Sequence, residues 1–285
     1  MCDLLCALPP ATGGPALFAK NSDRPPHERQ AFEHLPARTD VGPTRATWVR
    51  LDAHPTATLA VFGSRPAWGW GLEQGVNEAG VAAGNATIYT TLDPRAAADG
   101  VTGMDVVRLV LERCESAVAA VELIERLLAT VGQGGSGHAG VHRPYWSSFL
   151  IADPSVAFVV ETSGNAMAVE AVTSTRATSN RTTIASFDAA HRHRGQPVES
   201  LVDPRLRASE RALAARPVTV AALQAHLASH AGGEDGWTVC MHVDLPDHQE
   251  ATTAAMVAEL PDGGGPTVHH LTGSPCRGRW QVFRF

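Results

Sequence analysis

Two capped helical segments stand together near the middle of this chain, with short apolar strands on both sides of them. Thr102 begins the first segment, and Asp105 follows as an acidic partner for its first turn. Ser116 caps the second segment, which ends at Gly132. The apolar positions expected to face inward from this second segment are Val118, Val121, Ile124, Leu127 and Leu128. A helical pair set among strands limits the chain to a layered fold in which helices cover sheets.

The predicted strands are short and closely spaced, as in hairpins. Before the helical pair they cover residues 4–8, 15–19, 48–51, 58–63 and 81–83, and after it residues 148–152, 157–161 and 166–172. A tight turn is predicted at 75–80 and a last helix at 219–230. We find no repeat and no long linker, so we expect one domain over residues 1–285, of class α+β with antiparallel sheets.

Composition narrows the setting of the protein. The net charge of −6 and the pI near 6.1 argue against nucleic acid or an anionic membrane as a partner. No run of about 18 apolar residues is present, and we recognise no leader segment, so we expect no membrane span. Five cysteines at irregular spacings do not suggest a disulfide framework. We therefore expect a cytoplasmic protein in a reducing compartment.

The second residue of the chain is a cysteine. Methionine is normally removed before so small a residue, so we expect Cys2 to become the amino terminus of the mature protein. The thiol titrates near about 8.5 and the α-amine near about 7.7–8.0, so the amine can accept the thiol proton at neutral pH. Such a pair is the nucleophile and the general base of a covalent amide hydrolase. The alternative is that Cys2 is an incidental residue at the start of the chain.

Short blocks along the chain resemble those of the secernins and the related PepD-type dipeptidases. The opening blocks are CDLLCAL at 2–8 and FAKNSDR at 18–24. The later blocks follow in the family's order, at 70–78, 84–86, 148–153, 178–180, 238–242 and 272–276. The resemblance covers essentially the whole chain. It implies the N-terminal nucleophile (Ntn) hydrolase fold, a four-layer αββα sandwich of two antiparallel sheets between helices, and kinship with penicillin V acylase and bile salt hydrolases.

The resemblance also implies roles for residues near the chain start. Cys2 would attack the amide carbonyl with its own amine as proton acceptor, and Asp23 would hold that amine in place. Lys20 stands where bile salt hydrolases have an arginine, and a cation there would favour the thiolate. The alternatives are that Asp23 ends a strand-turn unit with Asn21 and Ser22, and that Lys20 is a solvated lysine at the end of a strand.

Further along the chain, the resemblance points to two asparagines and one arginine. Asn85 would receive the tetrahedral oxyanion together with a backbone N–H, although a Gly-Asn pair is also a common turn. Asn180 would orient the nucleophile and the substrate. Either Arg205 or Arg207 matches the family arginine; we favour Arg205, while both also read as exposed arginines at the start of a helix.

Several other residues have competing interpretations. Aromatic candidates for an apolar substrate pocket, or simply for the core, are Trp68, Trp70, Tyr89, Tyr145 and Trp146, of which we favour Trp70 and Tyr89 as substrate-binding. Cys6 reads as strand core, and a role as nucleophile would need a propeptide to be cleaved. Cys240 and Cys276 read as core residues or as thiols near the site.

We expect neither a metal nor another cofactor. The histidines at 191, 193, 269 and 270 lack the spacing of a Cys-x-x-Cys or His-Glu-x-x-His site, and a loop rich in His and Arg is typical of a solvated surface.

The function expected from the sequence is hydrolysis of linear carbon–nitrogen amide bonds through a Cys2 thioester, with dipeptides as the favoured substrates. The alternatives are an N-acyl amidase or acyltransferase of the penicillin acylase type, and a non-catalytic, secernin-like regulatory protein. The partner expected in either enzymatic case is a small peptide or N-acyl compound, with a homo-oligomer suggested by analogy.

Overall fold

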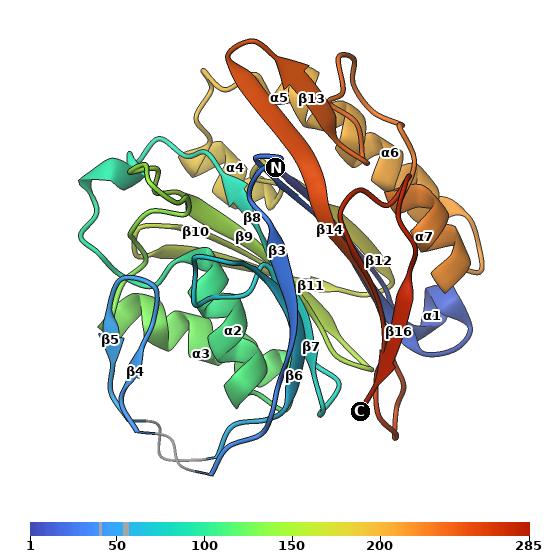
Figure 1. The fold of residues 1–285 in the computed structure, drawn as a ribbon, viewed down its shortest axis with the longest axis horizontal. Helices are drawn as coiled ribbons and strands as arrows, with labels where there is room; N and C mark the ends of the chain where they lie inside the picture. The colour runs from blue at the N-terminus through green and yellow to red at the C-terminus, as the bar shows by residue number, and fades with distance from the viewer. Residues whose placement is uncertain (40–41, 54–56) are drawn as a thin grey trace.

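The computed structural model describes residues 1–39, 42–53 and 57–285, and these form four layers (Figure 1). Two seven-stranded antiparallel sheets lie face to face, and helices cover the outer face of each. This arrangement confirms the predicted α+β fold with antiparallel sheets.

The first sheet contains the start of the chain. Its strand order is β12-β1-β2-β14-β15-β16, with β13 paired to β14. The bounds of its strands are β1 (Cys2–Ala7), β2 (Ala16–Arg24), β12 (Thr175–Thr178), β13 (His242–Leu245), β14 (His248–Leu260), β15 (Thr267–Thr272) and β16 (Gln281–Arg284). The short helix α1 (Pro9–Thr12) joins β1 to β2, and its cap Gly13 adopts φ +68°, which favours glycine. Because β1 lies between β2 and β12, the first residues of the chain are held from both sides.

The second sheet has the order β11-β10-β9-β8-β7-β6-β3. The bounds of its strands are β3 (Gln30–Leu35), β6 (Val61–Pro66), β7 (Gln74–Asn77), β8 (Ala82–Ile88), β9 (Trp146–Ala152), β10 (Ala157–Ser163) and β11 (Ala166–Val172). Outside it lie a small ribbon of β4 (Thr44–Arg45) and β5 (Arg50–Leu51) and the short 3₁₀ helix η1 (Pro94–Ala96).

Each outer helical layer has its own apolar core. The helices α2 (Gly103–Arg113) and α3 (Ala117–Thr130) pack on the second sheet, and α6 (Asp203–Ala214) and α7 (Val220–Leu227) pack on the first (Figure 1). The short helices α4 (Ala185–His191) and α5 (Val198–Leu201) lie in the connection that leads to α6.

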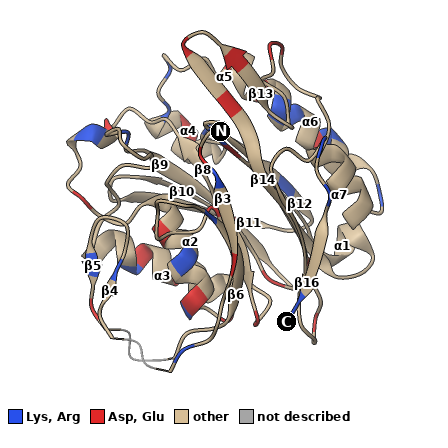
Figure 2. Cartoon of the chain, in the orientation of Figure 1, with Lys and Arg blue, Asp and Glu red and all other residues tan. Residues whose placement is uncertain are grey.

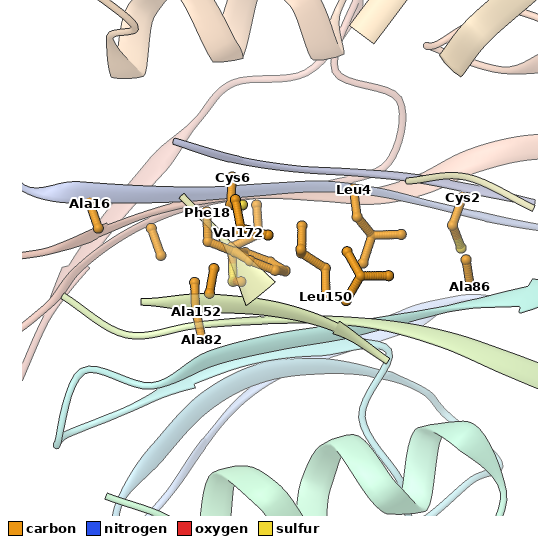
Figure 3. Packing of buried hydrophobic residues seen from close by; sticks show 14 of the residues in the cluster. Cys2, Leu4, Cys6, Ala16, Phe18, Ala82, Ala86, Leu150, Ala152 and Val172 are labelled. Carbon is orange, nitrogen blue, oxygen red and sulfur yellow. The ribbon is translucent and has the colours of Figure 1, made fainter. Parts of the chain in front are cut away.

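The third core lies between the two sheets (Figure 3). Leu4, Cys6 and Phe18 of the first sheet face Leu150 and Ala152 of the second in this layer, and all are buried. Successive side chains of a strand point to opposite faces, so this packing fixes which residues of β1 face the inter-sheet layer and which face α6 and α7.

The predicted helical pair is confirmed, with one correction. Thr102 Oγ1 accepts from the Asp105 N–H at 3.1 Å, while the Asp105 carboxylate accepts from the Thr102 N–H at 2.9 Å, which forms a complete capping box. Ser116 caps α3 through the Ala119 N–H. Val118, expected to face inward, is 50% exposed, because it lies off the buried stripe of α3. That stripe consists of Ala117, Ala120, Leu123, Ile124, Leu127 and Leu128.

Acidic and basic residues are both spread over the fold (Figure 2). Both signs occur in the helices and near the strand ends, in keeping with the modest net charge of −6. Among residues 1–39, 42–53 and 57–285, none of the helices combines the length and the apolar character needed to cross a bilayer.

Candidate active site

The backbone of Cys2 is held by the two residues that follow β12. The Cys2 N–H donates to Asn180 Oδ1 at 2.7 Å, and the Ser179 hydroxyl donates to the Cys2 carbonyl at 2.9 Å. The Asn180 amide in turn donates to the Thr87 carbonyl of β8 at 3.0 Å. Asn180 therefore joins the two sheets at the point where the nitrogen of Cys2 lies.

Asp23 lies beside the same end of β1. Its backbone N–H donates to the Met1 carbonyl at 2.8 Å, and its carbonyl accepts from the Met1 ammonium at 3.0 Å. The Thr252 hydroxyl donates to Asp23 Oδ1 at 2.6 Å. Burial raises the pKa of the Asp23 carboxyl to about 7, although the chain's ammonium and Arg205 oppose the shift. The Asp23 backbone therefore holds the Met1 ammonium, and its carboxyl is buried next to the chain start.

Arg205, on α6, is the buried cation of this group. Its Nη1 lies 2.7 Å from Asp3 Oδ2 and 3.8 Å from Asp23 Oδ2, and its Nη2 donates to Asn180 Oδ1 at 3.3 Å. The side chain has no exposed surface. Arg207, two residues later on α6, is 57% exposed and lies 3.9 Å from Asp203. Of the two arginines, the structure brings Arg205 to the chain start and leaves Arg207 at the surface.

The side chain of Lys20 runs between the sheets, beside the thiol of Cys2. Its Nζ lies 3.3 Å from Glu73 Oε2, and Arg24 Nη1 lies 3.1 Å from the other Glu73 oxygen. Burial raises the pKa of Glu73, but Lys20 and Arg24 outweigh it and hold the pKa below its usual value. Burial also raises the pKa of the Cys2 thiol, and Lys20 is the strongest influence in the opposite direction.

Gly84 of β8 makes room for this lysine. A Cβ on Gly84 would lie 2.7 Å from Lys20 Cδ and 3.1 Å from a methyl group of Leu4. The first distance is shorter than carbon–carbon contacts allow and the second is tight, so the alkyl part of Lys20 occupies the space that a side chain at position 84 would need.

Asn85 does not face the thiol as we expected. Its neighbour Ala86 faces Cys2 in the layer between the sheets (Figure 3), so the Asn85 side chain points to the opposite face of the strand, toward α2. A Cβ on Gly103 of α2 would lie 2.6 Å from Asn85 Nδ2. Asn85 Nδ2 donates instead to Tyr145 Oη at 3.2 Å. The link between Asn85 and the site is therefore indirect and passes through this tyrosine.

A cavity of about 720 Å³ opens beside the chain start. Met1 and Asn180 lie in its wall, as do Tyr89, Tyr145 and Trp146. Its charged and titratable wall residues are Asp93, Arg95, His138, His142, Arg143, His193, His248 and Glu250. The wall is thus mixed in character, with aromatic and ionic side chains together.

Trp70, expected to bind substrate, is not part of this wall among the residues that the structure describes. The guanidinium carbon of Arg108 lies over the Trp70 ring, 4.2 Å from the ring centroid. The Trp70 carbonyl accepts a hydrogen bond from Arg108 Nη1 at 2.9 Å. Trp70 therefore belongs to the layer around α2. Tyr89, the second expected substrate-binding residue, lies in the wall.

Comparison with known proteins places this arrangement in a family. The family model described as acyl-coenzyme A:6-aminopenicillanic acid acyl-transferase matches residues 11–195. The chain belongs to this acyl-transferase family. The narrower resemblance to secernins and PepD-type dipeptidases stays a prediction.

Three solved structures with a similar fold are described as hydrolases. A mutant of the conjugated bile acid hydrolase from Clostridium perfringens aligns with a TM-score of 0.62 and 13% identity, over 100% of this chain and 92% of that one. A second variant of that hydrolase gives 0.58 and 13%, over 100% and 97%. The N-acylethanolamine-hydrolyzing acid amidase ortholog of Caenorhabditis elegans gives 0.53 and 13%, over 92% and 94%. These likenesses establish the Ntn-hydrolase fold for this member of the family.

Two glutamates of the site are not among the site residues that the sequence predicts. Glu250 Oε1 lies 2.6 Å from the Met1 ammonium and is almost fully buried. Glu73 holds both Lys20 and Arg24. Glu73 lies within the family block at 70–78, but no local pattern assigns it a partner, because it meets Lys20 across the two sheets. Glu250 meets Met1 only through the pairing of β14 with β2. Cys6, by contrast, is core: burial raises its pKa to about 12.

The raised pKa of Asp23 gives the stability of the protein a pH dependence. The folded pKa of about 7 exceeds the ordinary value of 3.8, so between these values the folded state keeps a proton that the unfolded state has lost. Stability should therefore fall as pH rises from about 4 to 7, by up to ~1.4 kcal/mol per pH unit. Urea unfolding across this range should show a shallower decline for Asp23→Asn than for wild type. Asp244→Asn, an exposed carboxyl on β13, should match wild type. Equal slopes for wild type and Asp23→Asn would show that Asp23 titrates normally.

Proposed function

We propose that this chain, once it starts at Cys2, is an N-terminal-cysteine hydrolase of linear amide bonds that acts on small peptides, dipeptides above all. The observation that carries the proposal is the surroundings of Cys2. Its nitrogen is bound to Asn180, its thiol lies beside Lys20, and a cavity with an ionic wall begins at Met1. Removal of Met1 would open that cavity onto the thiol and would convert the bound nitrogen into a free amine.

In the proposed cycle the Cys2 thiol attacks the carbonyl carbon of the substrate, and its proton passes to the Cys2 amine. The tetrahedral intermediate collapses, the carbon–nitrogen bond breaks, and the leaving amine takes that proton. The acyl group is then held as a thioester on Cys2. Water gives a proton to the Cys2 amine and attacks the thioester, which releases the acid and restores the thiol. Asn180 and Asp23 would hold the amine during both halves.

Tyr145 is the side chain that we propose for stabilising the oxyanion. Burial raises its pKa, and Glu73 and Cys2 raise it further, so the phenol stays protonated at neutral pH. Because Asn85 donates to Tyr145 Oη, the phenol keeps its own proton for a second hydrogen bond. In this proposal Asn85 is a positioning residue that acts through Tyr145.

The charged wall of the cavity supports a dipeptide over a long apolar acyl chain. A dipeptide has an ammonium and a carboxylate, and both need partners when they leave water. Glu250 already binds an ammonium, that of Met1, at 2.6 Å. Arg143 and Arg95 supply cations in the same wall for a carboxylate.

An N-acyl amidase or acyltransferase is the second candidate, and the match to the acyl-transferase family model favours it. Its first half-reaction would be the same. In the second half an amine would replace water as the acceptor of the acyl group. A third possibility, a secernin-like regulatory protein without catalysis, would not depend on the thiol of Cys2.

The nucleophile is tested by replacing it. Cys2→Ala should abolish turnover of a mixed panel of dipeptides and N-acyl amino acids followed by mass spectrometry, because no thioester can form. Cys6→Ala removes a buried thiol of the same strand and should keep activity. The members of the panel that wild type cleaves decide between dipeptidase and acylase. Turnover by Cys2→Ala, or Met1 retained in fully active protein, would refute the proposal.

The oxyanion role is tested on the two tyrosines of the chain. Tyr145→Phe should lower kcat by about 10²–10³ with little change in KM, because it removes a donor used mainly in the transition state. Tyr89→Phe, in the same cavity wall, should affect KM and leave kcat within a few-fold. Asn85→Ala should lower kcat in the same direction as Tyr145→Phe. An unchanged kcat for Tyr145→Phe would rule out the phenol as the oxyanion donor.

Recognition of the substrate ammonium is tested at Glu250. Glu250→Gln should raise KM for dipeptides by about 10–100-fold, because it removes the charge from a charged hydrogen bond. It should leave the KM of the corresponding N-acetylated peptides unchanged. Glu259→Gln, which loses a partner of His269 outside the cavity, serves as the control of equal chemistry. Equal changes for free and acetylated peptides would contradict a role for Glu250 in binding the amine.

A further inference from the structure

A cluster of two cysteines and two histidines lies behind the candidate active site, and the proposed reaction does not use it. Its members are His230, Cys240, His242 and Cys276. One ligand atom from each residue, a ring nitrogen or a sulfur, lies within 4.8 Å of all the others. We define these four residues as the Cys₂His₂ cluster.

The cluster joins three separate segments of the chain. His230 follows the end of α7, Cys240 and His242 lead into β13, and Cys276 lies in the turn between β15 and β16. Backbone pairing brings the first two segments together, since the Cys240 N–H donates to the Ser229 carbonyl at 2.9 Å. In the sequence, this site is therefore marked locally by the Cys-x-His pair at 240–242, while the other two members of the cluster lie further along the chain on either side.

The distances within the cluster are close to those of a tetrahedral metal site. His242 Nε2 lies 3.4 Å from Cys240 Sγ and 3.2 Å from Cys276 Sγ. With Zn–S near 2.3 Å and Zn–N near 2.0–2.1 Å, tetrahedral ligand atoms are separated by about 3.3–3.8 Å. The rings of His230 and His242 meet edge to face, with centroids 5.2 Å apart. A shift of about 1 Å in the most distant ligand atom would complete the tetrahedron.

Hydrogen bonding alone satisfies this cluster poorly. A neutral imidazole nitrogen is either one donor or one acceptor, yet His242 Nε2 lies beside two sulfur atoms. A cation bound by two thiolates and two neutral imidazoles satisfies all four groups at once, and the two thiolates neutralise a divalent charge. Thiolate and imidazole together are the ligand set that selects Zn²⁺ in closed structural sites.

We propose that His230, Cys240, His242 and Cys276 bind one Zn²⁺ ion, in a structural site that supports the wall behind Asp23. Met241, between two of the ligands, exchanges hydrogen bonds with Thr252: its N–H donates to Thr252 Oγ1 at 2.9 Å and its carbonyl accepts from the Thr252 N–H at 3.2 Å. Ser274, two residues before Cys276, donates to the Thr252 carbonyl at 3.0 Å. Thr252 is the residue that donates to Asp23. The metal would thus fix both segments that hold Thr252.

The first test is the metal content of the full chain. Protein expressed with zinc in the medium should contain about one zinc per chain by elemental mass spectrometry, and Co²⁺ exchanged into the site should give the visible absorption of tetrahedral thiolate coordination. His230→Ala changes an exposed residue and should weaken zinc affinity by more than about tenfold, since losing even a hydrogen-bond partner of a metal ligand costs about that much. Cys276→Ser should weaken the cobalt–thiolate absorption, because it removes one of the two thiolates of the cluster. Cys114→Ser, which removes a thiol outside the cluster, should leave metal content and spectrum unchanged.

Stability supplies a readout that is independent of catalysis. A strong chelator should lower the melting temperature of wild type and of Cys114→Ser, and it should have little effect on His230→Ala. Several outcomes would overturn the proposal. They are failure of metal-free wild type to take up Zn²⁺ or Co²⁺, uptake that His230→Ala and Cys276→Ser leave unchanged, and a disulfide between Cys240 and Cys276 in protein isolated under reducing conditions. None of these outcomes depends on whether the proposed amide hydrolysis is correct.

Discussion

The ion pair between Arg205 and Asp3 is the interaction on which the chain start depends. Both side chains are fully buried, and they join α6 of the outer layer to β1 of the first sheet. A buried charge without its partner is strongly unfavourable, and breaking such a pair typically costs about 3–5 kcal/mol. The same guanidinium reaches Asn180 and lies near Asp23. Through this one cation, the packing of α6 determines where the nitrogen of Cys2 lies.

The alternation of side chains along β1 divides the site into two electrostatic halves. On the inter-sheet face, the thiol of Cys2 lies with Lys20, whose charge is balanced by Glu73. On the face toward the helices, Asp3 and Asp23 share the charge of Arg205. The nitrogen of Cys2 belongs to the backbone between these faces and bonds to Asn180. The proposed nucleophile, the Cys2 thiol, therefore lies on the face where Lys20 and Glu73 balance each other's charge. The proposed base, the Cys2 nitrogen, lies between that face and the face where Arg205 is balanced by Asp3 and Asp23.

The sequence predicts the parts of this molecule that local chemistry determines. Caps such as Thr102 and Ser116 are readable because the capping residue and its partner are three residues apart. Arg205 and Arg207 are two residues apart on a helix and so point in different directions, but only the partners brought by other strands decide which is buried. The error at Asn85 has the same origin, since the face on which a strand residue lies depends on the opposing sheet.

The cavity was the least predictable part of the site. Glu250 lies on β14, whose place beside β2 follows from pairing across more than 200 residues of chain, and nothing in the local sequence marks it. Trp70 and Tyr89 carry similar aromatic signals in the sequence. Trp70 lies under an arginine in the α2 layer and Tyr89 lies in the cavity wall, because β7 and β8, which separate them in the chain, cross the second sheet.

The glycine at position 84 gives this site an unusual kind of dependence. The volume that Gly84 leaves empty is filled by the methylene groups of Lys20, which carry a positive charge to the thiol. Gly84, which has no side chain, thereby determines where the charge of Lys20 lies relative to the Cys2 thiol. A Cβ at this position would lie 2.7 Å from Lys20 Cδ and would also press on Leu4 and Phe18, so a substitution that changes only volume would displace a charge.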